Sequence, residues 1–529
     1  MLPSLRRPIS RPIRVRPSAT HVSHLHPLHQ TMSTNITDLF PIPSSPPYKL
    51  IPKPWPGISP ESTTALREVL KDNHTRWDIF FNDSGFHNHS SHRAIANWAL
   101  GAAGDLIKAG YEEDSKTQRP ARDPPEPITT KNFKEHLGNR SYYGGYLAFF
   151  TDVISEQGVA SAVERYIFAK DMNIDPSAKK KPDVFNRFLG GLIHPMIHTG
   201  YGLEFCLPGM VAEGLAEAAV HSDESSARIP DDFFHYGGKA KGVEDTLSRL
   251  KSLLITSHEP SAKLSTTNGV HAFTVLKRVL DDPELGKVED TESGMFQRTM
   301  IDHAAVLAKH MSDWHVDGTN PRDVARKIEE LSWTNAMIYG VGGWAKDKHF
   351  NADFFHMHLV TSSIFLAAYA AYLTPSSQEH LLRGYFLVSL GWWVSRGRPN
   401  LDIKGFYETT SAHPKPSGAL PTPNKKALSP SDPAKVVNPN AWLPVIETCV
   451  VHADDHLPKL QRALAHYASL YGTREAGEAD FEATELPGAE LLDGTLFIRA
   501  AGLTATRMGR VREGEEPADF WDRNGFYKA

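Results

Sequence analysis

Apolar residues recur every three or four positions through several long stretches of the chain, the spacing that places them on one face of an α-helix. Ile95, Trp98, Ala102 and Leu106 follow this schedule in the first stretch. Alternation of apolar and polar residues, which indicates β-strands, is scarce. The pattern predicts a mainly α-helical fold, with one large multi-helix body rather than several independent domains. The stretches with helical period are 91–111, 158–169, 209–221, 300–314, 353–373 and 380–394.

Proline-rich and polar stretches interrupt the helical segments. Residues 410–440 are rich in proline, serine and asparagine, a composition that neither packs into a core nor continues a helix. We therefore expect a long loop there. Residues 1–45 are expected to be a disordered or non-native N-terminal extension, and residues 46–529 to form the helical catalytic domain.

The N-terminal extension has the charge of a mitochondrial targeting segment but not its helical pattern. Its first 37 residues contain no Asp or Glu and carry five arginines. The prolines at positions 3, 8, 12 and 17 would break the amphipathic helix that such a segment needs. We expect a cytoplasmic protein, and this segment leaves a mitochondrial location open.

Composition and charge exclude several classes of protein. The chain has 57 basic and 62 acidic residues and a net charge of −5, so no overall basic field attracts nucleic acid. The apolar runs 364–373 and 385–394 have half the roughly 20 residues of a membrane span. Cys206 and Cys449 are too few for a disulfide framework or a cysteine-based metal site. We expect a soluble protein without a nucleic-acid or membrane partner, of undetermined oligomeric state.

Histidine is frequent, with 26 residues, and falls in clusters. In FHNHSSH (86–92), His89 and His92 lie three residues apart and share a face if a helix begins near Ser90. In 190–202, Pro195 fits the start of a helix, and His194 and His198 lie one turn apart within an apolar wall. A buried neutral imidazole needs partners for its ring nitrogens, and a metal ion is one such partner.

A third cluster, DFFHMH (353–358), opens a long apolar helical segment. On a helix His356 and His358 would point in nearly opposite directions, so only one of them can face a shared centre. His358 lies at the start of the apolar helix and is the preferred ligand of the two.

The fourth cluster, HADDHLPK (452–459), is the densest. His452, His456 and Lys459 have the spacing of one helix face. Asp455 is placed to accept the imidazole N–H on the side away from a metal. Pro458 would kink such a helix, which weakens the prediction at Lys459.

These clusters lie far apart in the sequence, and most have apolar surroundings. Helical proteins build metal centres in this way, with ligands that project inward from several facing helices. Ligation by imidazole and oxygen suits iron, zinc, copper or nickel, and the residue types alone do not choose among them.

Four motifs, in this order, resemble the questin oxidase-like family of fungi: FHNHSSHRAIANWALGA, FLGGLIHPMIHTGYGLEF, DFFHMHLVTSS and HADDHLPK. The resemblance extends over about residues 83–499, most of the chain. It implies a largely helical oxidoreductase of fungal secondary metabolism. Such an enzyme oxidatively cleaves a carbon–carbon bond, and so opens a ring, of an anthraquinone or related aromatic polyketide, in a Baeyer–Villiger-like reaction. The expected partner is therefore a small aromatic molecule.

The resemblance also implies a non-haem iron(II) dioxygenase that uses O₂ and holds its metal with histidines and a carboxylated lysine. A lysine carbamate offers anionic oxygens to the cation, whereas an ammonium group is a poor ligand, and desolvation near the metal favours the neutral amine that reacts with carbon dioxide. The implied ligands are His198, His358, His456, Lys459, and one of His89 or His92. Three further residues are expected to contact the ligands on the side away from the metal: His194, His452 and Asp455.

Three polar residues near the motifs are candidates for proton transfer in such a reaction. Tyr201 and Glu204 follow the motif of His194 and His198, and Asp353 opens the DFFHMH motif. A phenol or carboxyl group within reach of a substrate exchanges protons with it. The alternative for each of them is a role in packing.

Three other functions fit parts of the pattern. A binuclear zinc hydrolase would need more carboxylate ligands, for which Asp454 and Asp455 are candidates. An NADPH-dependent Baeyer–Villiger monooxygenase would perform similar overall chemistry. Its flavin-dependent form requires GxGxxG after a strand, and the glycine-rich ranges 339–345 and 189–191 do not have this context. The need for NADPH is left open. A non-catalytic helical scaffold would bind no metal at all.

Overall fold

The computed structural model describes residues 35–233, 269–286, 295–418, 420–518 and 520–526. All of them belong to one compact unit, Thr34–Ala529, and a first unit, Met1–Ser33, lies outside the described residues. The predicted N-terminal extension falls largely in that first unit. Its last part, 35–45, is described and differs from the prediction, because the side chains of Leu39 and Phe40 are buried in the core. The boundary predicted at residue 45 is therefore too late.

Helices build the described part of the chain, as the apolar period predicts, and β-structure there is limited to isolated bridges. Regular caps define several of the helices. In α2 the side chains of Ser59 and Ser62 each accept a backbone N–H of the other residue. The helices in the first half of the chain are α1 (Ile36–Leu39), α2 (Pro60–Arg76), α3 (Ser90–Ala99), α4 (Gly104–Ser115), α5 (Tyr143–Gln157), α6 (Val159–Val163), α7 (Val184–Phe188), α8 (His194–Phe205) and α9 (Pro208–Val220). Those in the second half are α11 (Ala272–Asp281), α12 (Met295–His310), α13 (Pro321–Gly340), α14 (Phe354–Ser363), α15 (Leu366–Tyr372), α16 (Pro375–Ser395), α17 (Ile403–Thr409), α18 (Ala434–Val437), α19 (Trp442–Val450), α20 (Leu457–Tyr471), α21 (Ala479–Glu482) and α22 (Leu496–Met508).

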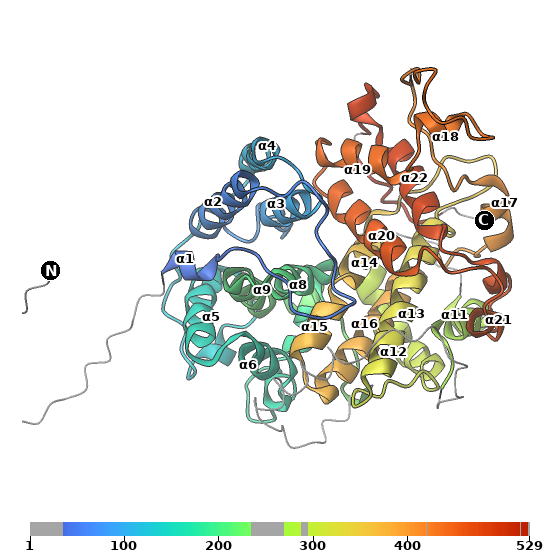
Figure 1. Ribbon diagram of the computed structural model, residues 1–529. Coiled ribbons are helices and arrows are strands. Elements are labelled where there is room, and N and C mark those ends of the chain that lie inside the picture. Colours follow the sequence, from blue (N-terminus) through green and yellow to red (C-terminus); the bar gives the residue numbers. More distant parts are fainter. Residues whose placement is uncertain (1–34, 234–268, 287–294, 419, 519, 527–529) are drawn as a thin grey trace, which may run out of the picture. The chain divides into compact units, whose positions relative to one another are not determined.

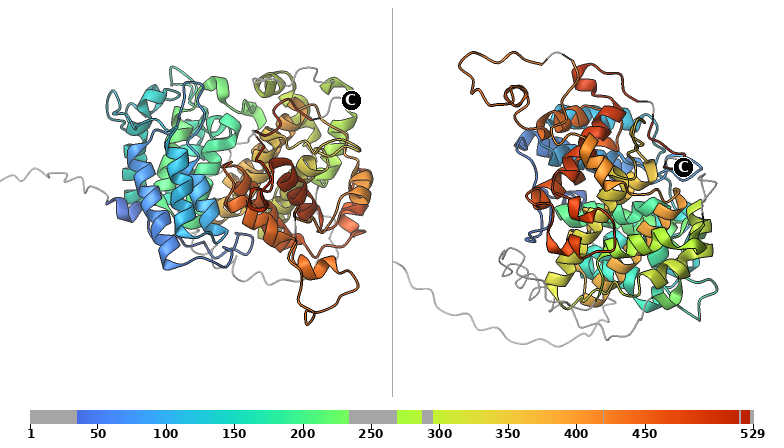
Figure 2. Two further views of the ribbon diagram at one scale, coloured as in Figure 1. Left: turned by 90° about the horizontal axis from the view of Figure 1, so that it is seen from above. Right: turned by 90° about the vertical axis from the view of Figure 1, so that its right-hand side faces the viewer.

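The helices of the two halves of the chain gather into two adjoining groups. Figure 1 shows α1–α9, in blue to green, beside the yellow-green to red helices from α11 onward, and the left view of Figure 2 shows the same division from above. The groups meet where α3 and α8 contact α14, α15 and α20. The four histidine motifs lie on or next to these helices, so the fold brings them to the seam between the groups.

The stretch 91–111, predicted as one helix, is divided into α3 and α4. The break falls at Gly101, whose φ of 83° lies in the left-handed region that favours glycine. A Cβ at this position would lie 2.3 Å from the carbonyl oxygen of Pro56. The chain turns at Gly101 because only glycine allows both this conformation and this close approach.

Substitution of Gly101 by alanine is expected to lower the free energy of unfolding. A strained backbone position alone costs about 1–3 kcal/mol, and we expect a larger loss here because the Cβ also collides with Pro56. Gly514 provides the matched control, since it lies in the left-handed region with a φ of 87° and nothing lies within 4 Å of its ideal Cβ. Gly514→Ala should show the backbone strain alone. Urea unfolding of both variants measures the difference, and equal losses would contradict the role given to the contact with Pro56.

The apolar segment 353–373 is also divided, into α14 and α15, where one continuous helix was predicted. The hydroxyl groups of Tyr385 and Tyr467 donate to the carbonyl oxygens of Leu359 and Val360, at 2.7 and 2.9 Å. These carbonyls would otherwise accept backbone N–H groups one turn later in the helix. Side chains from α16 and α20 therefore end α14 shortly after His358.

The stretch Phe354–Tyr372 is, among the described residues, long and apolar enough to cross a membrane by length and composition. Of its most apolar window, 94% is buried inside the protein, which is typical of a core helix. The proline-rich range 410–440 contains only the short helix α18 among its described residues and is largely exposed, as predicted.

Candidate metal centre

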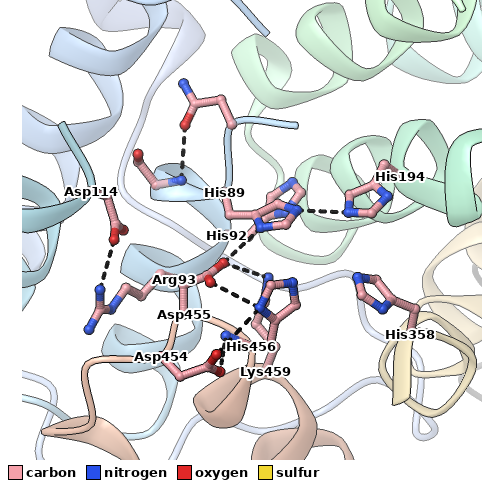
Figure 3. Close-up of polar contacts among 12 residues, drawn as sticks. His89, His92, Arg93, Asp114, His194, His358, Asp454, Asp455, His456 and Lys459 are labelled. Atoms are coloured by element: carbon pink, nitrogen blue, oxygen red, sulfur yellow. Dashed lines mark hydrogen bonds and ion pairs between the residues drawn. The ribbon is translucent and has the colours of Figure 1, made fainter. Parts of the chain in front are cut away.

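Four imidazole rings form a closed cluster at the seam between the two helix groups, which we call the four-histidine cluster: His89, His194, His358 and His456. Neighbouring ring centroids are separated by 4.8 Å (His89–His194), 5.0 Å (His194–His358), 5.1 Å (His358–His456) and 4.7 Å (His456–His89). Figure 3 shows the rings turned toward a common space. The structure thus unites one histidine from each of the four sequence motifs.

Each ring belongs to a different helix or to the residue that directly precedes one. His89 and His456 directly precede α3 and α20, His194 is the first residue of α8, and His358 lies within α14. The helices contact each other in the order α3, α8, α14, α20 and back to α3, which is the order of the rings. Prolines in the first turns of α8 and α20 fix where these helices begin and so where the adjoining histidines lie.

Backbone carbonyls fix the orientation of two of the rings. His194 Nδ1 lies 2.7 Å from the carbonyl oxygen of Gly191, and His358 Nδ1 lies 2.7 Å from that of Phe354. Since a carbonyl only accepts, both Nδ1 atoms carry the proton and donate it. The Nε2 atom of each ring is then left with its lone pair, which is the state required of a metal ligand.

The other two rings are held by one carboxylate. Asp455 places Oδ2 at 2.8 Å from His89 Nδ1 and Oδ1 at 2.9 Å from His456 Nδ1. Lys459 Nζ lies 3.1 Å from the same Oδ2. Burial favours the neutral acid, yet the neighbouring His456, Lys459 and His89 lower the pKa of Asp455 well below its ordinary value. An ionised Asp455 therefore faces the Nδ1 side of both rings, and Figure 3 shows it between them.

The Nε2 atoms have the environment expected of ligands. Those of His358 and His456 are buried and have no hydrogen-bond partner among the described residues. Those of His89 and His194 lie 2.7 Å apart. Burial, then the charge of Lys459, lowers the pKa of His89 to about 3, and burial lowers that of His194 well below its ordinary value, so both are neutral. Two lone pairs thus face each other, and a bound cation would stabilise this arrangement.

His198, predicted as a ligand, lies outside the cluster, and its neighbour one turn earlier, His194, takes that place. His198 Nδ1 is 3.0 Å from His92 Nε2, and its Nε2 is 2.6 Å from a carboxylate oxygen of Glu213 on α9. His92, the alternative to His89, pairs with His198 instead of joining the four rings. His194, predicted only to support the ligands, lies among the four rings.

His452 and Lys459 differ from the predicted helix face. The helix α20 begins at Leu457 with Pro458 in its first turn, so Pro458 starts the helix rather than kinking it, and His452 lies in the turn before it. The ring of His452 accepts the N–H of Asp454 and donates to the carbonyl oxygen of Met508. His452 therefore shapes the loop that carries Asp455, and it does not contact the cluster through the predicted helical spacing.

The three residues predicted to transfer protons all have structural partners. Asp353 accepts the backbone N–H of His356 and two N–H groups of Arg396. Glu204 pairs with Arg462, and burial raises the pKa of its carboxyl to about 7 although Arg462 acts to lower it. These contacts explain why the carboxyl groups of Asp353 and Glu204 are buried. A role of the two carboxyl groups in proton transfer stays a prediction.

Tyr201, the third of these residues, is fully buried. Its ring stacks on His92 with centroids 5.1 Å apart and meets the ring of Phe365 edge-on. Burial raises the pKa of its phenol far above the ordinary value, so the hydroxyl group stays protonated at neutral pH. Tyr201 thus lies one ring away from the four-histidine cluster, behind His92.

Two carboxylates of α9, those of Glu213 and Glu217, are buried beside the histidines and were not predicted from the sequence. The signal was available in 209–221, where two glutamates one turn apart and His221 one turn later interrupt an otherwise apolar helix. A charged residue in the middle of an apolar face requires a partner, and here the partners are imidazoles.

Replacement of Asp455 by asparagine is expected to weaken metal binding by about 10–100-fold, because the amide cannot hold two imidazole N–H groups with an ionised oxygen on each. Asp454→Asn serves as the control. It retains the side-chain oxygen that accepts the backbone N–H groups of His456 and Leu457. Titration with iron(II) under argon measures both affinities, and equal affinities of the two variants would contradict the role assigned to Asp455.

The fold and the cluster define a mainly α-helical protein with a buried imidazole site. The chain belongs to the questin oxidase-like family, whose model matches residues 86–464. The match includes all four rings of the cluster.

Among its relatives is a Baeyer-Villiger oxidase, ptaJ, of Pestalotiopsis fici, 26% identical over 79% of this chain and 83% of the relative. The questin oxidase of Aspergillus fumigatus is 27% identical over 66% of this chain and 74% of its own length. The oxidoreductase AflY of Aspergillus parasiticus is 28% identical over 58% and 57%. Two of these relatives are named as oxidases and one as an oxidoreductase, and the protein is an oxidoreductase.

Proposed function

We propose that the protein is a non-haem iron oxygenase that oxidatively cleaves a carbon–carbon bond of an anthraquinone or related aromatic polyketide and so opens a ring. One observation carries the iron site: each ring of the four-histidine cluster has its Nδ1 next to an oxygen acceptor, which leaves its Nε2 for the shared centre. Supporting oxygens behind imidazole ligands are a regular feature of protein metal sites. Names of relatives such as questin oxidase support the substrate class.

Iron(II) suits this donor set, because neutral imidazoles bind divalent iron and, when bound, the iron supplies activation of dioxygen. The residues of the chain then have three tasks. They hold the cation with imidazole nitrogens, balance its charge with the ionised Asp455, and keep bulk water away by burial. A hydroquinone-type or phenolate substrate would provide the electrons, so that O₂ is the only oxidant required.

Carboxylation of Lys459 belongs to the same proposal. Its side chain is buried next to the cluster, and Nζ lies 3.1 Å from Asp455 Oδ2. Loss of a proton from the ammonium group, followed by reaction of the amine with carbon dioxide and release of a second proton, would form a carbamate and replace this cation by an anionic oxygen ligand. Intact-protein mass spectrometry without acid would detect the added carbon dioxide, and Lys459→Arg should abolish it. An unmodified mass under these conditions would contradict carboxylation.

A Baeyer–Villiger monooxygenase that takes its electrons from NADPH is the second candidate, since several relatives carry the Baeyer-Villiger name. Its flavin-dependent form needs a dinucleotide fold built on a parallel sheet. The described residues contain isolated β-bridges and no sheet. The iron oxygenase without a flavin is therefore the better supported of the two, and a zinc hydrolase does not match the oxidase names of the relatives.

The proposal is tested by loading the purified protein with iron(II) and mixing it with an anthraquinone, or its reduced hydroquinone form, under ¹⁸O₂. We expect oxygen consumption and a ring-opened product that carries ¹⁸O, without NADPH. Zinc-loaded protein is the control and should be inactive. Activity that requires NADPH, or that is equal with zinc, would contradict the proposal.

A further inference from the structure

A second group of metal-binding side chains lies next to the four-histidine cluster: His87, Glu217 and His221, which we call the α9 cluster. All three are buried. The Nε2 atoms of His87 and His221 are 2.8 Å apart, and His87 Nε2 lies 3.2 Å from Glu217 Oε1. One ligand atom from each residue lies within 4.8 Å of the others. None of the three belongs to the iron site proposed above.

Glu217 distinguishes this group from an ordinary buried hydrogen-bond network. It is fully buried, and neither of its carboxylate oxygens has a hydrogen bond within the described residues. Burial, then the charge of Glu213, raises the pKa of Glu217 well above its ordinary value. Without a positive partner this buried carboxyl group is held in its neutral form, and a bound cation would favour the carboxylate.

Glu213, one turn earlier on α9, shows the contrast. Its two oxygens lie 2.6 Å from His74 Nδ1 and 2.6 Å from His198 Nε2. These hydrogen bonds outweigh its burial and lower the pKa of Glu213 to about 2. The same helix thus carries one carboxylate with two hydrogen-bond partners and one without a hydrogen bond among the described residues.

The backbone leaves room for the imidazole of His221. Gly191 has a φ of 53°, and a Cβ there would lie 2.1 Å from His221 Cε1 and 2.3 Å from Nε2. The ring of His221 occupies the space that a side chain at position 191 would fill. Phe80 packs against both His87 and His221 and closes the other side.

We infer that His87, Glu217 and His221 bind a second divalent cation of the zinc or iron class. Two imidazole nitrogens and one carboxylate oxygen form a ligand set that both metals use in proteins. Three protein ligands leave a further position for water or another small ligand. The shared donor chemistry fits either metal, and elemental analysis of the protein as purified distinguishes them.

The α9 cluster adjoins the four-histidine cluster directly. The rings of His87 and His194 stack with centroids 4.0 Å apart and an interplanar angle of 10°. A cation on His87 Nε2 would fix this ring and, through the stack, the ring of His194. The inference does not depend on the identity of the metal in the first site or on the reaction proposed for it.

The test uses full-length protein in which His358→Ala disables the four-histidine cluster. After loading with zinc and removal of free metal, we expect this variant to retain about one zinc per chain. Adding Glu217→Gln should remove it, because the amide keeps the size of the side chain but not its charge. Adding Glu213→Gln instead should leave the zinc in place, since Glu213 faces His74 and His198.

Two results would overturn the inference: His358→Ala protein that retains no zinc, or a Glu217→Gln double variant that retains as much zinc as its parent. Circular dichroism checks that each variant folds. If a variant fails to fold, anomalous diffraction at the zinc edge from wild-type crystals tests the inference instead. We expect a peak between His87, Glu217 and His221, and the absence of a peak there overturns the inference. Failure of the first site would appear separately, as equal zinc content in wild type and His358→Ala.

Discussion

Replacement of His358 by alanine is expected to abolish iron binding at the four-histidine cluster and, with it, oxygenase activity. His358 contributes a buried Nε2 without another hydrogen-bond partner among the described residues, and its Nδ1 is already engaged by Phe354. Loss of a ligand should weaken binding by more than the roughly 10–100-fold typical of losing an outer hydrogen-bond partner. Iron titration and oxygen consumption measure the two effects.

His356→Ala is the matched control for this variant. His356 lies two residues earlier on α14, is equally buried, and packs toward Phe526 rather than toward the other imidazoles. The same truncation there should leave iron affinity and activity close to those of the wild type, with some loss of stability from the cavity. Parallel loss of iron in both variants would show a general packing effect and contradict the role of His358 as a ligand.

Substitution of Arg396 by methionine is expected to lower the free energy of unfolding by about 3–5 kcal/mol, because it leaves a buried carboxylate without its cation. Arg396 donates from Nε and Nη2 to Asp353 Oδ2, at 3.0 and 2.8 Å, and both side chains are buried. Asp353 also caps α14, the helix that carries His358. Denaturant unfolding measures the loss.

The loss caused by Arg396→Met should depend on pH. Burial raises the pKa of Asp353, and Arg396 acts to lower it, so the variant raises this pKa further. The pKa of such a carboxyl group is higher in the folded state than in the unfolded state. The group therefore destabilises the fold increasingly as the pH rises from the lower of these two pKa values to the higher. The difference from wild type should therefore be largest at neutral pH and shrink in acid.

Arg512→Met is the control for the buried pair. Arg512 pairs with Glu447 at 2.9 Å, but both side chains are about half exposed. Loss of such a pair should change stability by less than about 1 kcal/mol. Similar losses for Arg396→Met and Arg512→Met, or a loss at Arg396 that grows in acid, would contradict the account of the buried pair.

The helical class of the fold could be predicted because the apolar period is a local property of the sequence. The points where helices break were harder. The left-handed turn at Gly101 depends on a close approach to Pro56, and the end of α14 depends on hydroxyl groups of Tyr385 and Tyr467 from other helices. These contacts join residues far apart in the chain, so local pattern does not reveal them.

The motifs of the candidate site could be found from the sequence, but not which histidine of each motif joins the four-histidine cluster. His194 and His198 lie one turn apart and are equivalent by spacing, and the choice between them depends on how α8 meets α14 and α9. The position of His452 before the helix, rather than on its face, could have been predicted, because a proline in HADDHLPK marks the first turn of a helix as readily as a kink. Asp455 was predicted as a supporting residue, and its contacts with two rings are consistent with that role.

Anomalous diffraction at the iron edge from crystals of iron-loaded protein tests the central proposal most directly. We predict a peak within bonding distance of the Nε2 atoms of His89, His194, His358 and His456. A peak bonded instead to His92 or His198, or no iron at the four-histidine cluster in protein that is active, would contradict it.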